Sequence, residues 1–150
     1  MGILGSNLVS TIRTHEYRIL DEHLEKEARI VAVASLPLLH GETSVLDAFT
    51  KALGVQTGVR ITIISLDGTV VGDSVEYPSI MDNHATRPEV RDALLPGLGE
   101  IRRYSSTVNE EMEYVAVPIV DQGRVVGVAR TAVTLEAVEG VVIGVVLVVI

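Results

Sequence analysis

The last eleven residues, Gly140 to Ile150, carry no polar side chain. As a helix they would rise only about 16 Å, which is shorter than the roughly 30 Å hydrocarbon core of a bilayer. A soluble domain rarely exposes an uninterrupted apolar run of this kind. We therefore expect residues 137–150 to be the start of a truncated transmembrane helix, and the preceding domain to be tethered to a membrane.

The composition allows one aliphatic core and narrows the range of functions. Of the 150 residues, 47% are hydrophobic but only 3% are aromatic, so Val, Ile, Leu and Ala should fill the core. A net charge of -8, with twelve scattered basic residues, argues against a nucleic-acid partner. The absence of cysteine excludes disulfides, a thiolate nucleophile and Cys-ligated zinc. We assign no cofactor and no metal.

A long amphipathic helix is predicted over residues 8–40, because apolar residues recur at helical spacing and no Gly or Pro interrupts them before Pro37. The preceding residues 1–7 are read as a remnant of a first membrane segment or as an unrelated end. A narrow apolar stripe on the helix suits a homodimer contact, or packing against its own domain. The candidate dimer residues are Leu20, Leu24, Ala28 and Val31.

Residues 41–135 have the pattern of one domain with both helices and strands. Thr43 or Ser44 is expected to cap a second helix that ends at Gly54. Runs of β-branched residues then alternate with turn signals such as Asp67-Gly68, and helices are expected on one side of the resulting sheet. Short connections make the last three strands an antiparallel meander. The strands are predicted at about residues 59–66, 69–72, 100–107, 112–120 and 124–134, with a helix at 88–95 before the meander.

Three segments, ITIISLDGTVVGDS, MDNHATRPEV and RYSSTVNEEMEYVAVPIVDQGRVVGVARTAV, follow one another between about Arg60 and Thr134. In order and spacing they resemble the extracytoplasmic PAS-like sensor domain (PDC or Cache type) of membrane histidine kinases, especially the PhoR-type group. The resemblance implies an α+β fold with a five-stranded antiparallel sheet flanked by helices. It also implies a domain on the outer side of the cell membrane that senses a small ligand or a protein signal.

The same resemblance implies a homodimeric receptor whose missing cytoplasmic part is a protein-histidine kinase acting on a response regulator. This fragment itself is expected to bind and transmit, not to catalyse. Alternatives are the same sensor fold on a chemoreceptor or a cyclic-dinucleotide enzyme, a small membrane-anchored enzyme that uses His84, and a membrane-anchored partner-binding module without a small ligand.

Five side chains are candidates for ligand or signal sensing. His84 and Arg87 lie in a polar loop that either caps the following helix or meets an anion or a proton-linked signal. Tyr104 and Tyr114 lie on neighbouring predicted strands, and Arg102 shares a face with Tyr104. These three either line a cavity between sheet and helices or belong to the core.

The polar loop that carries His84 and Arg87 does not indicate a hydrolase. Ser79, Asp82 and His84 supply the residue types of a catalytic triad, but they crowd within six positions and no nucleophile elbow presents the serine. We assign no catalytic residue.

Overall fold

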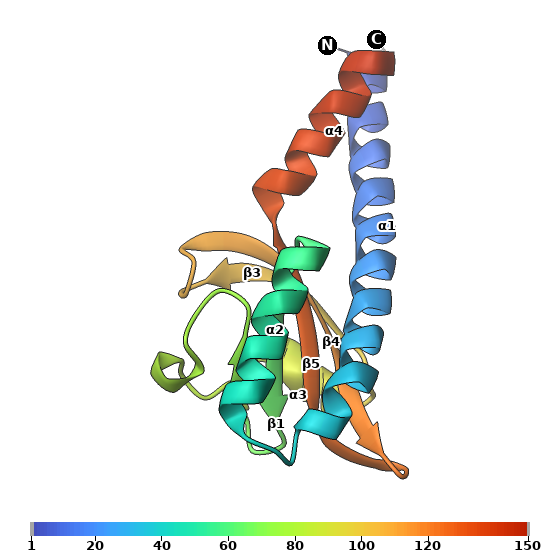
Figure 1. The fold of residues 1–150 in the computed structure, drawn as a ribbon. Helices are drawn as coiled ribbons and strands as arrows, with labels where there is room; N and C mark the ends of the chain where they lie inside the picture. Colours follow the sequence, from blue (N-terminus) through green and yellow to red (C-terminus); the bar gives the residue numbers. More distant parts are fainter. Residues whose placement is uncertain (1, 150) are drawn as a thin grey trace.

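A computed structural model describes residues 2–149, so Met1 and Ile150 of the two predicted membrane-proximal ends lie outside the described residues. One sheet and several helices make up the chain (Figure 1). The helices are α1 (Ile3–Ser35), α2 (Thr43–Thr57), α3 (Pro88–Leu94), α4 (Leu135–Val149) and the 3-10 helices η1 (Leu36–Leu38) and η2 (Pro78–Ile80). The strands are β1 (Arg60–Ser65), β2 (Val70–Asp73), β3 (Gly99–Ser105), β4 (Glu110–Asp121) and β5 (Arg124–Thr134).

The predicted five-stranded antiparallel sheet is confirmed, with the strand order β2-β1-β5-β4-β3. The β4–β5 hairpin turns at Gln122 and Gly123, whose φ angles of 49° and 79° match the right-handed twist of the flanking strands. The predicted meander of β3, β4 and β5 is present, and β1 pairs with the free side of β5. The α+β fold with a long amino-terminal helix is therefore confirmed.

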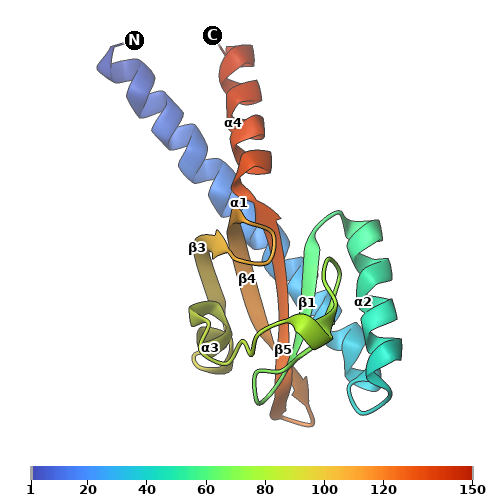
Figure 2. The ribbon, with the colours of Figure 1, turned by 90° about the vertical axis from the view of Figure 1, so that its left-hand side faces the viewer.

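Helices α1 and α2 cover one face of the sheet (Figure 2). Leu24, Ala28 and Val31 of α1 are buried there against strand residues such as Ile61 and Val115. The candidate dimer stripe, which also includes Leu20, therefore packs on the domain's own sheet. Leu24, Ala28 and Val31 are covered by the domain itself and are not available for a dimer contact, whereas Leu20 is only partly buried; a homodimer remains a prediction.

Helix α3 covers the opposite face, which corrects the expectation that all helices lie on one side. It approaches closely because Gly99 and Ala116, which are register partners on β3 and β4, present almost no side chain to it. A Cβ atom on Gly99 would lie 2.0 Å from the carbonyl oxygen of Glu89. Val90 and Ala93 of α3 then pack on this face of the sheet.

Helix α2 runs past Gly54, where the sequence predicts its end, and stops at Gly58 with a φ of 73°. Gly54 instead allows a close approach, since a Cβ atom there would lie 2.4 Å from the Cβ of Ser74. A glycine needed for packing and a glycine needed for a helix end look the same in a single sequence.

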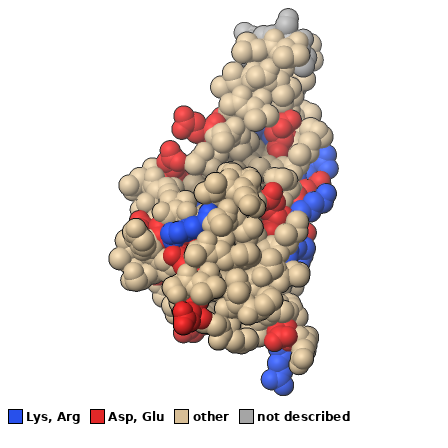
Figure 3. Space-filling view, viewed as in Figure 1, with Lys and Arg blue, Asp and Glu red and all other residues tan. Residues whose placement is uncertain are grey.

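Both ends of the chain project from the same end of the domain (Figures 1 and 2). Helix α1 begins at Ile3, so it includes most of residues 1–7, and β5 leads directly into α4. The projecting tip shows no charged side chain in Figure 3. No helix within residues 2–149 is both long enough and apolar enough to cross a bilayer. The membrane helix expected at residues 137–150 falls on α4 and stays a prediction.

The close contact between α3 and β3 can be tested with Gly99→Ala. The new methyl group would meet the Glu89 carbonyl, so the free energy of unfolding should fall by about 2–3 kcal/mol. Urea denaturation measures this loss. Gly140→Ala in α4 is the matched control, because a Cβ atom there meets nothing and alanine favours a helix. Equal stability of the two variants would contradict the packing described.

Candidate functional site

The α3 face of the sheet carries a buried carboxylate bound by two arginines. Glu89 of α3 is fully buried. Its carboxylate accepts hydrogen bonds from Arg103 Nε of β3 at 3.1 Å and from Arg130 Nη1 of β5 at 2.8 Å. Burial raises the pKa of Glu89, but the Arg103 hydrogen bond and the charges of both arginines outweigh it and hold this pKa below its ordinary value. Glu89 is thus ionised and ties the helix to two strands.

Tyr114 of β4 provides an aromatic floor for both guanidinium groups. Its ring centroid lies 4.1 Å from Arg103 Cζ and 4.6 Å from Arg130 Cζ, within the range of cation–π attraction. Arg130 is buried and also donates from Nη2 to Thr62 Oγ1 at 3.2 Å. Its Nε has no acceptor among the described residues. One donor of a buried cation is therefore left for a further acceptor.

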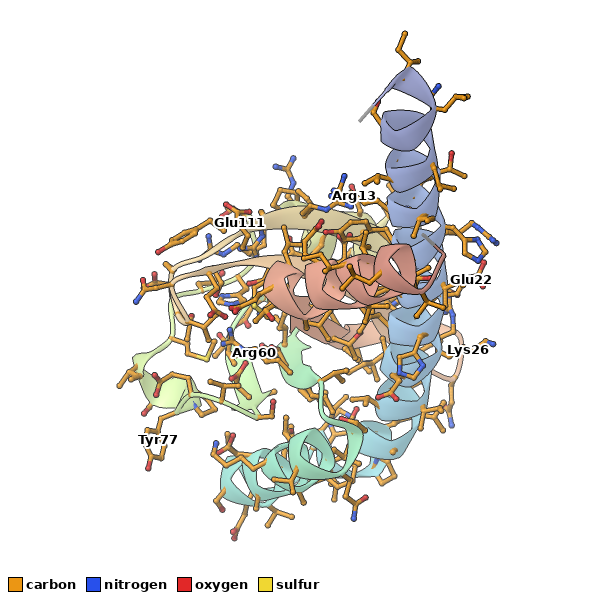
Figure 4. The ribbon with its side chains drawn as sticks, turned by 90° about the horizontal axis from the view of Figure 1, so that it is seen from above. Arg13, Glu22, Lys26, Arg60, Tyr77 and Glu111 are labelled. Atoms are coloured by element: carbon orange, nitrogen blue, oxygen red, sulfur yellow. The ribbon has the colours of Figure 1, made fainter. Side chains whose placement is uncertain are left out.

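A second buried ion pair lies beside the first. Arg60 Nε of β1 donates to both oxygens of Asp73 on β2, at 3.3 and 3.2 Å. Asp73 also accepts from Thr62 Oγ1 at 2.7 Å and from the backbone N–H groups of Val75 and Glu76 at 2.9 Å. The carboxylate is thus saturated and fixes the start of the loop after β2. Arg60 lies in the interior, between the sheet and that loop (Figure 4).

The loop before α3 brings His84 and Arg87 to the same place. His84 is buried, and its Nδ1 donates to the carbonyl oxygen of Asp82 at 2.7 Å. Burial and the charges of Arg130 and Arg87 lower the pKa of His84 to about 4, so its ring is neutral at physiological pH. Arg87 precedes the first residue of α3, and its Nε is buried without an acceptor among residues 2–149.

These side chains surround a small cavity of about 10 Å³, enough for about one water molecule. Four guanidinium groups meet two carboxylates here, which leaves an excess of two positive charges around a neutral histidine. Such a site favours an anion, and it must open to admit anything larger than water. We call this site the arginine pocket; its lining residues are Arg60, His84, Arg87, Arg103, Ser105, Ser106, Thr107, Tyr114 and Arg130.

Three of the five candidate sensing residues, His84, Arg87 and Tyr114, meet in the arginine pocket, and two do not. Arg102 lies on the α1 face, where its Nε donates to Glu113 Oε2 at 2.9 Å. Tyr104 is half exposed, and its hydroxyl donates to Asn109 Oδ1 at 3.1 Å. Neither of the two lines the arginine pocket, and Arg102 instead lines a groove between α1 and β3.

The register explains this arrangement. Tyr114 pairs with Ile101, so the odd-numbered residues of β3 share its face, and these include Arg103. The sequence did not indicate the charged residues of the strands and of α3 that form the pocket or pair with its arginines, which are Arg60, Asp73, Glu89, Arg103 and Arg130. A charge inside a β-branched run, as at Arg130 in VARTAV, was the available signal, because such a charge requires a buried partner.

No group of His, Asp and Glu side chains in the described part of the chain is arranged to hold a metal ion. Comparison with known proteins then identifies the fold. The profile of the single Cache-like family matches residues 15–132. The chain belongs to the single Cache-like family.

Solved structures similar to this Cache domain are themselves sensor domains. The sensor domain of the Vibrio cholerae histidine kinase DctB is 16% identical, with a TM-score of 0.66 over 89% of this chain and 57% of that one. The sensory domain of the Campylobacter jejuni chemoreceptor Tlp3 with isoleucine bound is 11% identical, with a TM-score of 0.72 over 91% and 60%. The chain thus spans less than two thirds of both.

The sensor domain of Escherichia coli DcuS is nearer in length. It is 14% identical, with a TM-score of 0.65, and the match covers 81% of this chain and 96% of that one. No curated protein sequence matches the Cache domain. At these identities the solved structures establish the shared fold alone.

Glu89→Gln tests the buried ion cluster. The amide removes the negative charge that the buried Arg130 and the partly buried Arg103 share, so the free energy of unfolding should fall by about 3 kcal/mol. Glu22→Gln is the control, because Glu22 forms an exposed pair with Arg18 on α1 and should lose less than about 0.5 kcal/mol. Chemical denaturation compares the two, and a loss at Glu89 no larger than at Glu22 would contradict the cluster.

The ionisation of His84 can be followed by NMR. Its ring protons should titrate with a midpoint near pH 4, against about 6.5 in the unfolded chain. Between about pH 6.5 and 4, His84 is protonated in the unfolded chain but stays neutral in the folded one. Protonation therefore stabilises the unfolded state, and the free energy of unfolding should fall as the pH drops through this range. A midpoint between 6 and 7 in the folded protein would show that His84 is not buried beside the arginines.

Proposed function

We propose that this Cache domain is the extracytoplasmic signal-sensing domain of a membrane-anchored two-component histidine kinase. We further propose that its signal is a small anion that binds in the arginine pocket. The observation that carries the proposal is the excess of two positive charges in a buried site that still has unused donors on Arg87 and Arg130.

The charge of the pocket favours a dianion over a zwitterion. Glu89 and Asp73 already neutralise one charge each, so a ligand with two carboxylates, or a phosphate, would balance the two that remain. Planar guanidinium groups bind both kinds of anion through paired N–H donors. His84 is neutral, so it lines the pocket with a polar ring but adds no charge to it.

The cover of the pocket consists of two loop segments and is the part that must move. One is the segment that carries His84 and Arg87, and the other is the turn at residues 106–109 between β3 and β4. Neither is a strand of the sheet, so both can shift without breaking strand pairing. Ligand entry would draw these loops onto the anion and change the strain on β3 and β4.

Transmission to a kinase would run through the two terminal helices. α1 and α4 contact each other where they leave the sheet and diverge toward the two ends of the chain (Figure 2), and we propose that both helices continue into the membrane from this apolar end of the domain (Figure 3). A change in their relative position is the kind of motion that biases a two-state output domain. The receptor is proposed to act as a homodimer and to signal to a response regulator through its cytoplasmic part.

The similarity to the Tlp3 sensory domain favours a chemoreceptor as the second candidate output. The input step at the arginine pocket is the same in both cases. A phosphoacceptor helix and an ATP-binding domain after Ile150 would establish the kinase, and a long methyl-accepting coiled coil would establish the chemoreceptor.

Calorimetric titration of the chain with succinate, inorganic phosphate and L-isoleucine tests the ligand class. We expect succinate or phosphate to bind and isoleucine to bind more weakly, because only the first two are dianions. Arg87→Gln should weaken binding at least tenfold, since a charged hydrogen bond is lost. Arg91→Gln is the matched control, because Arg91 lies on the exposed side of the same helix. Binding that is unaffected by Arg87→Gln would contradict the proposed site.

A further inference from the structure

A second cluster of charged groups lies where α1 crosses the sheet and meets α4, on the face opposite the arginine pocket. Arg13, Tyr17 and Asp21 follow one another at four-residue intervals, so they share one side of α1. Figure 4 shows Arg13 on the side toward the sheet and Glu22 on the side away from it. We call this cluster the α1 junction; it comprises Arg13, Tyr17, Asp21, Glu100, Arg102, Glu113 and Glu139.

The junction connects α1 to three other elements. Arg13 donates from Nε and Nη2 to the two carboxylate oxygens of Glu139 on α4, each at 3.0 Å. The ring of Tyr17 lies 3.6 Å from Arg102 Cζ of β3. Arg102 in turn pairs with Glu113 of β4 at 2.9 Å. These contacts set the position of the amino-terminal half of α1, which projects beyond the sheet.

Within residues 2–149, Asp21 forms no ion pair with a basic side chain, whereas Glu139 and Glu113 pair with Arg13 and Arg102. Its Oδ1 is buried and has no hydrogen-bond partner within residues 2–149. Its carboxyl group lies within hydrogen-bonding reach of that of Glu113, which is itself buried. Two carboxylates this close share one arginine, and a proton held between them would supply the missing donor.

A groove of about 530 Å³ is lined by Asp21, whereas Glu113 lies buried behind it and does not line the groove. Its charges are mixed, and Asp21 faces groups from its own helix, from β3 and from β4. The acidic groups around Asp21 are Glu22 and Glu25 of α1, Glu100 of β3 and Glu113 of β4. The basic groups are Arg13 and Arg18 of α1 and Arg102 of β3. Tyr17 also lines the groove, and Glu139 of α4 pairs with Arg13.

We propose that the α1 junction is a second input site of this domain and that its ligand is the proton. Asp21 and Glu113 hold one proton between them while α1 is docked on the sheet. Loss of that proton places an additional negative charge beside Glu113 and Glu100, and the repulsion loosens α1 from β4. The site is separate from the arginine pocket and does not depend on the identity of its anion.

The electrostatics place this proton in the physiological range. Burial of the Asp21 carboxyl and the charges of Glu113 and Glu100 raise its pKa to about 7, although Arg102 opposes them. Burial and the charges of Glu25 and Glu113 raise the pKa of Glu100 as well. Because the Asp21 pKa is higher in the folded state, its contribution to the docking of α1 is complete at acidic pH and is lost as the pH rises through about 7.

Side-chain carboxyl NMR of the full chain in detergent micelles tests the proton site. The ¹³C signal of Asp21, assigned by its loss in Asp21→Asn, should titrate with a midpoint near pH 7. Glu113→Gln should lower that midpoint by at least one pH unit, whereas Glu22→Gln should leave it unchanged because Glu22 is exposed. A midpoint below about 5 in the wild-type chain, or one that Glu113→Gln does not move, would overturn the proposal.

The consequence for α1 is measured by the distance between two spin labels. The chain contains no cysteine of its own, so spin labels can be attached to cysteines introduced at the exposed positions Ser10 of α1 and Glu136 of α4. Between pH 6 and pH 8 the distance distribution should broaden or shift in the wild-type background and in Glu22→Gln. In Asp21→Asn, which imitates the protonated carboxyl, it should keep the pH 6 form at both values. The same pH response in Asp21→Asn would overturn the assignment to Asp21.

Discussion

The buried carboxylate of Glu89 is the interaction on which the arginine pocket depends. It holds Arg103 of β3 and Arg130 of β5 over the ring of Tyr114, and it fixes α3 to the sheet at the point where Gly99 lets the helix approach. Two guanidinium groups at this depth are tolerable only with a counter-charge. Because Glu89 supplies one charge for two arginines, the cluster keeps an excess of positive charge, which is the basis of our proposal that it binds an anion.

The pleat of β3 and β4 relates this pocket to the α1 junction. Arg102 and Arg103 are adjacent in the chain but face opposite sides of the sheet, and Glu113 and Tyr114 do the same. In our proposal, a shift of β3 that moves Arg103 toward an anion also changes the position of Arg102 relative to Tyr17. The two sites can influence one another through the backbone of these two strands, without a chain of side chains through the core.

The fold was largely predictable because its signals are local. β-Branched runs and turn residues located all five strands, and β5 was predicted with its observed bounds at Arg124 and Thr134. Features that depend on contacts between distant segments were not predictable. Gly54 was assigned to a helix end because nothing in the sequence indicates that Ser74 packs against it.

The site residues also differ in this way: those with a local sequence signal were predicted, and those that depend on distant contacts were not. His84 and Arg87 were found because polar residues gather in one loop. Arg103 was missed because choosing it over Arg102 requires the register between β3 and β4, and Glu89 was missed because its two arginines lie 14 and 41 positions away.

We propose that this Cache domain receives its signal in the arginine pocket, on the α3 face of the sheet. A backbone amide chemical-shift map of the chain, recorded with and without saturating succinate, would locate the binding site. If the anion binds in the arginine pocket, the largest changes fall at residues 82–91, at residues 103–108 and around Arg130. Changes concentrated in the groove between α1 and β3, with residues 82–91 unaffected, would contradict it.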